Sequence, residues 1–378
     1  MLNSLQIKNF RSLEDFKVSK LGRVNLIVGK NNSGKSSVLE ALRIYAGNAN
    51  QQLLENISAS HNEKFRLNNE DIGQRNMSFP FEDLFIGRQY PIDENMEIVI
   101  GETLIDQKAL FIRHVFFVDR TDHEPNFQGA SINRPQIISK AEIKNSDTPF
   151  KQALWVHNQN NNNNELSFLI RFENNPFTNP RLSTINPYPQ ESFIPTQFIS
   201  VDDLAKEWDQ IIFTEHEAVI KSAMRIILPD FENLAFVGER IDRFAKVKLA
   251  HSTRPVPLKS LGDGMIRVLQ IALKLVSAKG SFLLIDEFEN GLHYSTQEKI
   301  WALLFEMSER LNIQIFATTH SWDCIEAFTK VAIENETTEG VLFRMGKSAK
   351  KSNQGQIIAT VFDKERLHNL TQADIEIR

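Results

Sequence analysis

The stretch VNLIVGKNNSGKSSVLEAL, from Val24 to Leu42, restricts the fold of this chain more than any other. A short apolar run leads into a turn that contains two glycines, and apolar residues at helical spacing follow the turn. This pattern predicts a buried strand over 23–28 and a helix over 34–45. The turn therefore joins the end of a strand to the start of a helix, where backbone N–H groups can face one anion.

The turn from Gly29 to Ser36 matches the pattern G-x-x-x-x-G-K-[ST] completely. Glycines let the backbone turn inward, and the helix N-terminus adds its positive dipole end. We expect Lys35 to reach the β- and γ-phosphates of a nucleoside triphosphate and the Ser36 hydroxyl to ligate Mg²⁺. The alternative is a chance glycine-rich turn, which the complete pattern in this context disfavours. The predicted phosphate-binding residues are Gly29, Asn31, Asn32, Ser33, Gly34, Lys35, Ser36 and Ser37.

A second apolar strand, predicted over 282–285, ends in Asp286 and Glu287. Ligands of open α/β sheets bind at the C-terminal ends of the strands, where these two acids lie. We expect Asp286 to hold Mg²⁺ through a water and Glu287 to polarise the attacking water. A buried strand that ends in solvated acids is the alternative for such a pattern alone.

A third apolar strand, predicted over 314–318, is followed by His320. A lone histidine at a strand end is usually structural, but its place after a third sheet strand favours contact with the γ-phosphate. From Asp202 onward strands and helices alternate, which predicts a mainly parallel sheet covered by helices. The expected helices are 202–228, capped by Asp202 or Asp203, then 264–277, 295–311 and 322–328; the other expected strands are 234–237 and 245–249.

A turn of small residues, Gly262-Asp263-Gly264, opens the helix expected at 264–277. This helix start is a second position that favours an anion. One chain has no second triphosphate for it to face, whereas a second copy of the chain would provide one.

The remaining regions carry weaker patterns. Strands are expected at 2–8, 14–18, 96–104 and 110–118, and the polar stretch 51–91 shows little periodicity. The region 121–195 contains an asparagine run and several prolines, which predicts an insertion with mobile loops. A loop extension without function is the alternative.

Net charge and cysteine content limit the class of protein. A formal net charge of −5 argues against a chain built mainly to cover nucleic acid, although a local basic groove is compatible with it. Cys324 is the only cysteine, so no intramolecular disulfide can form and a cytoplasmic protein is expected. No apolar run approaches about 18 residues, so we expect no membrane span.

Together these motifs occur in the order of ABC-type ATPase heads. Their particular residues resemble those of the SMC, RecF and OLD group. The opening IKNFRSLEDF resembles the first strands of that group, and Glu289–His293 resembles its D-loop. The resemblance implies an α/β P-loop NTPase fold with a mixed sheet, N-terminal antiparallel strands and a helical lobe. It divides one head, 1–378, into a helical or signature lobe at 202–280 and a Walker B and H-loop part at 281–378.

The resemblance also implies a homodimer that encloses ATP and Mg²⁺ between two heads arranged head to tail. Lys35, Ser36, Asp286, Glu287 and His320 would act from one chain. The signature turn of the other chain would touch the γ-phosphate, and its residues are Ser260, Gly262, Asp263 and Gly264. Arg11 matches a nucleotide-contacting arginine of such heads, with a surface arginine as the alternative.

The chain departs from the family pattern at several points. Gly262 occupies the position of the signature serine, and Ser260 lies two residues earlier. The Q-loop glutamine has three candidates, Gln74, Gln89 and Gln136. No heptad run predicts a coiled-coil arm. We expect no TOPRIM nuclease domain, because the stretch after His320 is short and no Asp-x-Asp occurs.

Two functions follow from the resemblance. The first is a stand-alone OLD-like AAA ATPase whose cycle regulates a partner effector, such as a separately encoded nuclease in phage defence. The alternative is a RecF- or SMC-like DNA-maintenance ATPase that binds DNA directly, and an ABC transporter subunit comes third. Glu142-Ile143-Lys144 could end a nuclease triad, but such tripeptides are common, so we expect the pure chain not to cut DNA.

Overall fold

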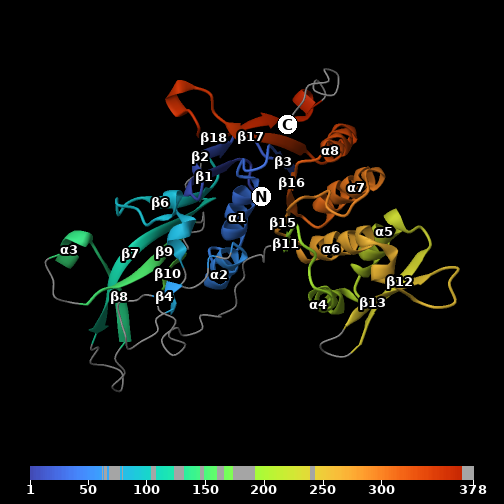
Figure 1. Ribbon diagram of the computed structural model, residues 1–378, viewed down its shortest axis with the longest axis horizontal. Coiled ribbons are helices and arrows are strands. Elements are labelled where there is room, and N and C mark those ends of the chain that lie inside the picture. The colour runs from blue at the N-terminus through green and yellow to red at the C-terminus, as the bar shows by residue number, and fades with distance from the viewer. Residues whose placement is uncertain are drawn as a thin grey trace. The chain divides into compact units, whose positions relative to one another are not determined.

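The computed structural model divides the chain into two compact units (Figure 1). The first unit comprises Met1–Leu5, Lys17–Ala46 and Pro189–Arg378, and the second comprises Gln6–Phe16 and Gly47–Tyr188. The structure describes residues 1–61, 63, 66–67, 77–78, 80–103, 108–122, 132–144, 149–159, 166–172, 192–238 and 243–367.

A six-stranded mixed sheet forms the centre of the first unit. Its order is β11–β15–β16–β3–β17–β18, and every neighbouring pair is parallel except β17 with β18. All residues of β3 and β15 are buried, as expected for strands covered on both faces. The strands are β3 (Val24–Val28), β11 (Ser192–Ile194), β15 (Phe282–Ile285), β16 (Gln314–Thr319), β17 (Gly340–Lys347) and β18 (Ile357–Phe362). The predicted mainly parallel sheet is confirmed.

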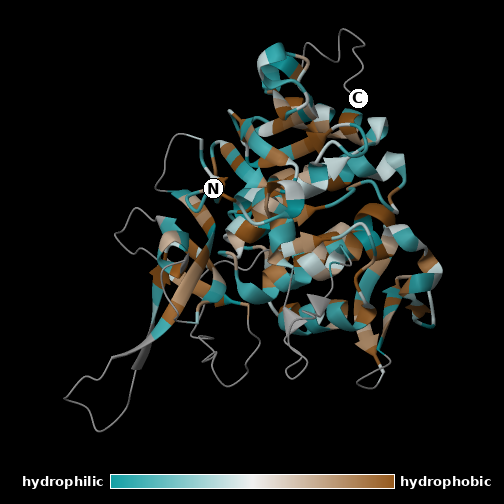
Figure 2. Cartoon of the chain, turned by 60° about the vertical axis from the view of Figure 1, so that its left-hand side comes forward, coloured by the Kyte–Doolittle hydropathy of each residue, from teal (hydrophilic) through white to brown (hydrophobic). Residues whose placement is uncertain are grey.

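Amphipathic helices pack against this sheet. The helix α1 contacts β15 and β16, whereas α6, α7 and α8 contact β11, β3 and β17 respectively and lie side by side (Figure 1). Figure 2 shows both hydrophobic and hydrophilic residues on the helical ribbons of the chain. Trp301 of α7 stacks on Phe288 in the shared core. The helices are α1 (Lys35–Ala46), α4 (Val201–Ile211), α5 (Glu217–Ile227), α6 (Asp263–Ser277), α7 (Tyr294–Arg310) and α8 (Trp322–Glu334).

The prediction of a single helix over 202–228 is wrong, because two helices, α4 and α5, occupy this stretch. Phe213 has a φ of 66°, which no helix accommodates. The Thr214 hydroxyl donates to the Ile211 carbonyl, and this bond satisfies an acceptor at the end of α4. The expected cap is also wrong, since Ser200 accepts from the backbone N–H of Asp203.

A small antiparallel sheet lies beside these helices in the first unit. It consists of β12 (Phe231–Val237), β13 (Phe244–Leu249) and β14 (Val256–Pro257). The strand β12 contacts α5 and β13 contacts α4, so this sheet and the helices share one core.

A larger, mainly antiparallel sheet dominates the second unit. Its order is β10–β9–β7–β6–β1–β2, and β8 also pairs with β7. The pairs β1–β6, β6–β7, β7–β8, β7–β9 and β9–β10 are antiparallel. Antiparallel pairing was expected for the N-terminal strands, and β1 shows it with β6. The strands are β1 (Leu5–Phe10), β2 (Leu13–Val18), β6 (Glu97–Gly101), β7 (Ala109–Asp122), β8 (Ile132–Ile138), β9 (Lys151–Gln159) and β10 (Leu166–Arg171).

The described part of 121–195 is more regular than the composition indicates. The strands β8, β9 and β10 and the helix α3 (Lys140–Lys144) replace the expected loops, while β11 belongs to the sheet of the first unit. The helix α2 (Gln51–Ser60) and the small strands β4 (Arg66–Leu67) and β5 (Met77–Ser78) were likewise not anticipated. Most of the asparagine run and Pro176, Pro180, Pro187 and Pro189 lie outside the described residues. The insertion and lobe boundaries stay predictions.

Among the described residues, no helix is both long enough and apolar enough to cross a membrane.

Candidate functional site

The glycine-rich turn between β3 and α1 has a backbone that few residues could adopt. Gly29 has a φ of 153°, and a Cβ there would lie 2.7 Å from both the Met345 carbonyl oxygen and Ser33 Oγ. Gly34 has a φ of 92°, and Asn32 also lies in the left-handed region at 61°. The φ angles and the close neighbouring atoms therefore require glycine at these positions. The glycines allow the backbone to turn before α1 begins.

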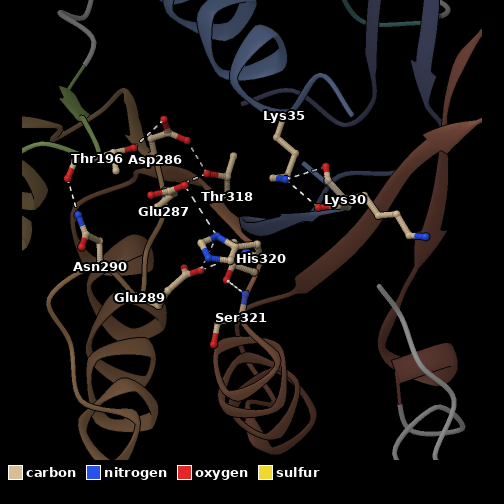
Figure 3. A network of polar contacts seen from close by, with 12 residues as sticks. Lys30, Lys35, Thr196, Asp286, Glu287, Glu289, Asn290, Thr318, His320 and Ser321 are labelled. Atoms are coloured by element: carbon tan, nitrogen blue, oxygen red, sulfur yellow. Dashed lines mark hydrogen bonds and ion pairs between the residues drawn. The ribbon is translucent and has the colours of Figure 1, made fainter. Parts of the chain in front are cut away.

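Lys35, the first residue of α1, reaches back over this turn. Its Nζ donates to the carbonyl oxygen of Gly29 at 2.7 Å and to that of Lys30 at 3.1 Å (Figure 3). Burial lowers the pKa of Lys35, and the carboxylates of Asp286 and Glu287 oppose that shift. The ammonium thus lies within electrostatic range of the acids that follow β15.

The turn also contains a buried polar atom without a hydrogen-bond partner in the described part of the chain. Ser33 is 9% exposed, and its Oγ makes no hydrogen bond. A buried hydroxyl of this kind is uncommon in a native structure, and it fits a turn that holds a polar group of a ligand.

Asp286 is held by two threonine hydroxyls at the ends of neighbouring strands (Figure 3). Thr318 Oγ1 donates to its Oδ1 at 2.6 Å, and Thr196 Oγ1 donates to its Oδ2 at 3.1 Å. The parallel registers, which pair Ile285 with Ala317 and with Ile194, bring the three strand ends together. Neutral donors therefore orient this carboxylate through its hydrogen bonds.

Neither threonine is predicted by the sequence motifs. For Thr318, a polar hydroxyl at the end of an apolar run is a usable signal. Thr196 follows the short edge strand β11, which lies in a proline-rich stretch without a clear strand pattern.

Glu287 has a strained backbone. Its φ is 47°, a left-handed conformation that costs a residue other than glycine on the order of 1–3 kcal/mol. Its backbone N–H donates to Thr318 Oγ1 at 2.9 Å. The carboxylate side chain is 38% exposed, and its Oε1 lies 3.8 Å from His320 Nδ1. Glu287 therefore presents an accessible carboxylate on a loop that its neighbours hold in place.

His320 is oriented by Glu289, another residue whose role was missed. Glu289 Oε1 accepts from the His320 backbone N–H at 3.1 Å and lies 3.2 Å from His320 Nδ1 (Figure 3). The Glu289 side chain is only 13% exposed, whereas that of His320 is 54% exposed. A ring held through Nδ1 can present its other nitrogen, Nε2, to a ligand.

The Gly262-Asp263-Gly264 turn precedes and opens α6 in the same unit. Gly262 is the N-cap residue, has a φ of 93° and makes no side-chain capping bond. A Cβ on Gly264 would lie 3.1 Å from the carbonyl oxygen of Gly291, so the turn packs closely on the loop after β15. Ser260, in the preceding 3₁₀ helix (Leu258–Leu261), Gly262 and Asp263 are exposed.

Arg11 lies in the second unit. Its Nη1 is 3.1 Å from Glu63 Oε1, and the two side chains are only 8% and 6% exposed. The expected nucleotide contact of Arg11 stays a prediction. Of the three candidate Q-loop residues, Gln136 is in β8, Gln89 follows a 3₁₀ helix, and Gln74 lies outside the described residues.

The oxygen ligands available at this site suit Mg²⁺. Asp286 contributes a carboxylate, and Ser36 contributes an exposed hydroxyl at the start of α1. Mg²⁺ prefers one or two protein oxygens together with water and phosphate oxygens. The residues present therefore fit the metal.

The fold and the arrangement of these motifs are those of an α/β P-loop NTPase domain. A family model described as "AAA domain, putative AbiEii toxin, Type IV TA system" matches residues 24–323. The chain belongs to this family.

Several known proteins are similar to the chain. An ATP/GTP phosphatase of Helicobacter pylori is 23% identical over 354 residues, which cover 89% of this chain and 90% of that protein. The DNA replication and repair protein RecF of Clostridioides difficile is 30% identical over 117 residues, 30% of this chain and 26% of RecF. A solved SMC head bound to the C-terminal winged-helix domain of ScpA has a TM-score of 0.48 and 13% identity, covering 97% of this chain and 99% of that one.

Proposed function

We propose that the chain binds and hydrolyses ATP, with Mg²⁺, at the edge where β3, β15 and β16 end. The observation that carries this proposal is the grouping of Lys35, Asp286, Glu287 and His320, which come from separate loops and helices of one unit (Figure 3). Membership in an AAA domain family and similarity to an ATP/GTP phosphatase support it.

Each residue has a role that its surroundings support. The backbone N–H groups of the 29–36 turn and Lys35 bind the phosphates. Ser36 and Asp286 would hold Mg²⁺, which when bound would neutralise charge on the phosphate oxygens. Glu287 accepts a hydrogen bond from the attacking water, and His320 faces the γ-phosphate.

We further propose that two copies of the chain close around ATP. Ser260, Gly262 and Asp263 of the signature turn are exposed, and within one chain the turn serves no second triphosphate. The N-terminus of α6 would complete the site of the other copy through its backbone N–H groups.

Lys35→Ala tests nucleotide binding, with Lys30→Ala as the matched control. Lys30 lies in the same turn, but its exposed side chain points away from the site (Figure 3). Lys35→Ala should abolish phosphate release and weaken ATP binding by several kcal/mol in calorimetry, because a close charge partner is lost. Lys30→Ala should bind and hydrolyse ATP like the wild type. Unchanged ATP affinity in Lys35→Ala would contradict the assignment.

The favoured biological role is that of a cytoplasmic OLD-type ATPase head whose cycle regulates an effector protein, such as a separately encoded nuclease in phage defence. The similarity to RecF favours the alternative, in which the closed dimer binds DNA directly. Affinity purification of a hydrolysis-blocked Glu287→Gln chain tests the first role. Fluorescence anisotropy with labelled duplex DNA tests the second, since phosphate contacts make such binding fall steeply with salt.

A further inference from the structure

Arg267 is buried in the first unit although it carries a guanidinium. It lies on α6 and is 0% exposed. Burial lowers its pKa to about 10, while Asp286, Glu289 and Glu287 oppose that shift. A buried charge is stable only where hydrogen bonds and opposite charges compensate it, so its partners indicate what the burial serves.

The hydrogen bonds of Arg267 go to backbone carbonyls that follow β11 and β15. Its Nη1 donates to the Pro195 carbonyl oxygen at 2.9 Å. Its Nη2 donates to the carbonyl oxygens of Asp286 and Glu287, each at 2.8 Å. The guanidinium therefore binds the backbone of the loop that carries the two acids, not their side chains.

The two carbonyls bound by Nη2 belong to the two peptide planes that flank the Cα of Glu287. Rotation about φ and ψ of a residue moves these planes relative to one another, so one nitrogen that holds both oxygens restrains both torsions. Glu287 has the disfavoured φ of 47°, and its N–H is held by Thr318 Oγ1. Arg267 and Thr318 thus hold the strained backbone of Glu287 from two sides.

The helix that carries Arg267 also begins at the signature turn. Arg267 lies three residues after Gly264, about 4.5 Å along the axis at 1.5 Å per residue. A Cβ on Gly291, in the loop after β15, would lie 3.7 Å from the Cβ of Arg267. A shift of the turn at the start of α6 would therefore move the guanidinium and the loop packed on it.

We propose that Arg267 is a positioning residue that couples the Gly262–Gly264 turn to the backbone of Glu287. The inference rests on the proposed function, in which this turn contacts the triphosphate bound by a second copy. Contact at the turn aligns α6, and Arg267 then fixes Glu287 where its carboxylate can face the attacking water. Hydrolysis in one site is thereby made to depend on the nucleotide held by the other.

Arg267→Lys tests the coupling because it keeps the charge but replaces a planar fork by a single ammonium. We expect kcat to fall by about 10–100-fold, as for a small misplacement of a reacting group, while the Kd for ATP stays within about threefold. In a Glu287→Gln background the same change should lower kcat by less than about threefold, because the positioned group is already lost. Arg225→Lys is the control, since Arg225 also donates from a helix to a backbone carbonyl, that of Phe231.

Two results would overturn the inference. One is an unchanged kcat in Arg267→Lys, and the other is a full, multiplicative loss in the Glu287→Gln background. If the wild-type chain hydrolyses no ATP, the proposed function fails, and a crystal structure of Arg267→Lys still decides the coupling. Glu287 should leave the left-handed region there, and a Glu287 that stays near its wild-type φ would refute a positioning role.

Discussion

The two units of the molecule use charged side chains in different ways. At the strand edge of the first unit, a neutral hydroxyl holds Asp286, because Thr318 Oγ1 donates to it, and Glu287 keeps an accessible carboxylate. In the second unit, Arg11 and Glu63 face each other with almost no exposure. A charge compensated by an opposite charge serves the fold, whereas one held by neutral donors at a strand edge stays available to a ligand.

Other charges of the second unit follow the same rule. The Arg171 guanidinium donates to Asp119 at 3.0 Å and lies 5.0 Å from the centre of the Phe117 ring. Arg113 lies 4.6 Å from the ring of Trp155 on the neighbouring strand. Such contacts across strands stabilise a sheet. Substitutions there should change stability, while substitutions at the edge of the first unit should change turnover.

Among the substitutions that compare the two units, the largest effect is expected for Glu287→Gln in the first unit. The amide keeps the shape of the side chain but removes the charge that polarises the water, so kcat should fall by about 10²–10⁴. Phosphate release measures the loss, and light scattering with ATP should show an accumulated dimer. A variant that stays monomeric with ATP would contradict closure of two copies.

Asp119→Asn in the second unit is the matched control for Glu287→Gln. It also replaces a carboxylate by an amide, but Asp119 pairs with Arg171 and with Lys151 at 3.5 Å. Turnover should stay at the wild-type level. A comparable loss of turnover in Asp119→Asn would contradict the claim that paired carboxylates of the second unit serve stability and not turnover.

Arg11→Ala should reduce stability rather than turnover. Removal of one partner from a buried ion pair typically costs about 3–5 kcal/mol, because the other charge stays buried. Arg88, whose Nη2 lies 3.6 Å from Glu63, remains as a partner of that carboxylate. The loss of stability should therefore lie near the lower end of this range. Urea unfolding measures the change.

The ATP affinity of Arg11→Ala provides a separate test. A raised Kd in protein that remains folded would support the nucleotide contact expected from the resemblance. An unchanged Kd together with an unchanged urea midpoint would contradict both roles.

Glu289→Gln should have a smaller effect, on the orientation of His320. The amide oxygen can still accept from the His320 backbone N–H, but the charge beside Nδ1 is lost. Hydrogen bonds to charged groups exceed neutral ones by about 1 kcal/mol, so kcat should fall about fivefold with little change in the Kd for ATP. In a His320→Ala background the same substitution should have no effect, and an additive loss would show that Glu289 acts elsewhere.

The sequence predicts the parts of this site that local chemistry dictates. A left-handed glycine before Lys35 and two acids after a buried strand can be recognised from the neighbouring residues of the sequence alone. Thr196 and Arg267 could not be predicted, because their roles depend on the register of β11 with β15 and on the packing of α6. The Phe213 break in the predicted 202–228 helix was hidden by helical spacing that continues on both sides of it.

Regions without clear periodicity were the least predictable part of the fold. The strand β9 contains both Trp155 and part of the asparagine run, so its composition indicated a loop. Its antiparallel pairing with β7 and β10 overrides that composition, because the ladder hydrogen bonds come from the backbone. Tertiary pairing of this kind leaves no signal within a short window of sequence.

The smallest effect is expected for Glu142→Ala, in the tripeptide that could end a nuclease triad. The Glu142 carboxylate accepts from the Ser139 N–H at 2.7 Å and from its hydroxyl at 2.9 Å. The Glu142 N–H donates back to Ser139 Oγ at 3.3 Å, which completes a capping box for α3. A carboxylate engaged in a cap is a structural group, so its loss should cost about 0.5–2 kcal/mol and leave ATP turnover unchanged.

The pure chain should therefore leave plasmid DNA intact with Mg²⁺ or Mn²⁺, because metal-dependent cleavage needs acids beyond those that serve the nucleotide. Agarose gels of supercoiled plasmid, with wild type, Glu142→Ala and Lys35→Ala in parallel, provide the test. Cleavage by the wild type that persists in Lys35→Ala but disappears in Glu142→Ala would assign a nuclease site to the second unit. The contrast between a structural and a reactive unit would then fail, since a carboxylate paired within the fold would have proved catalytic.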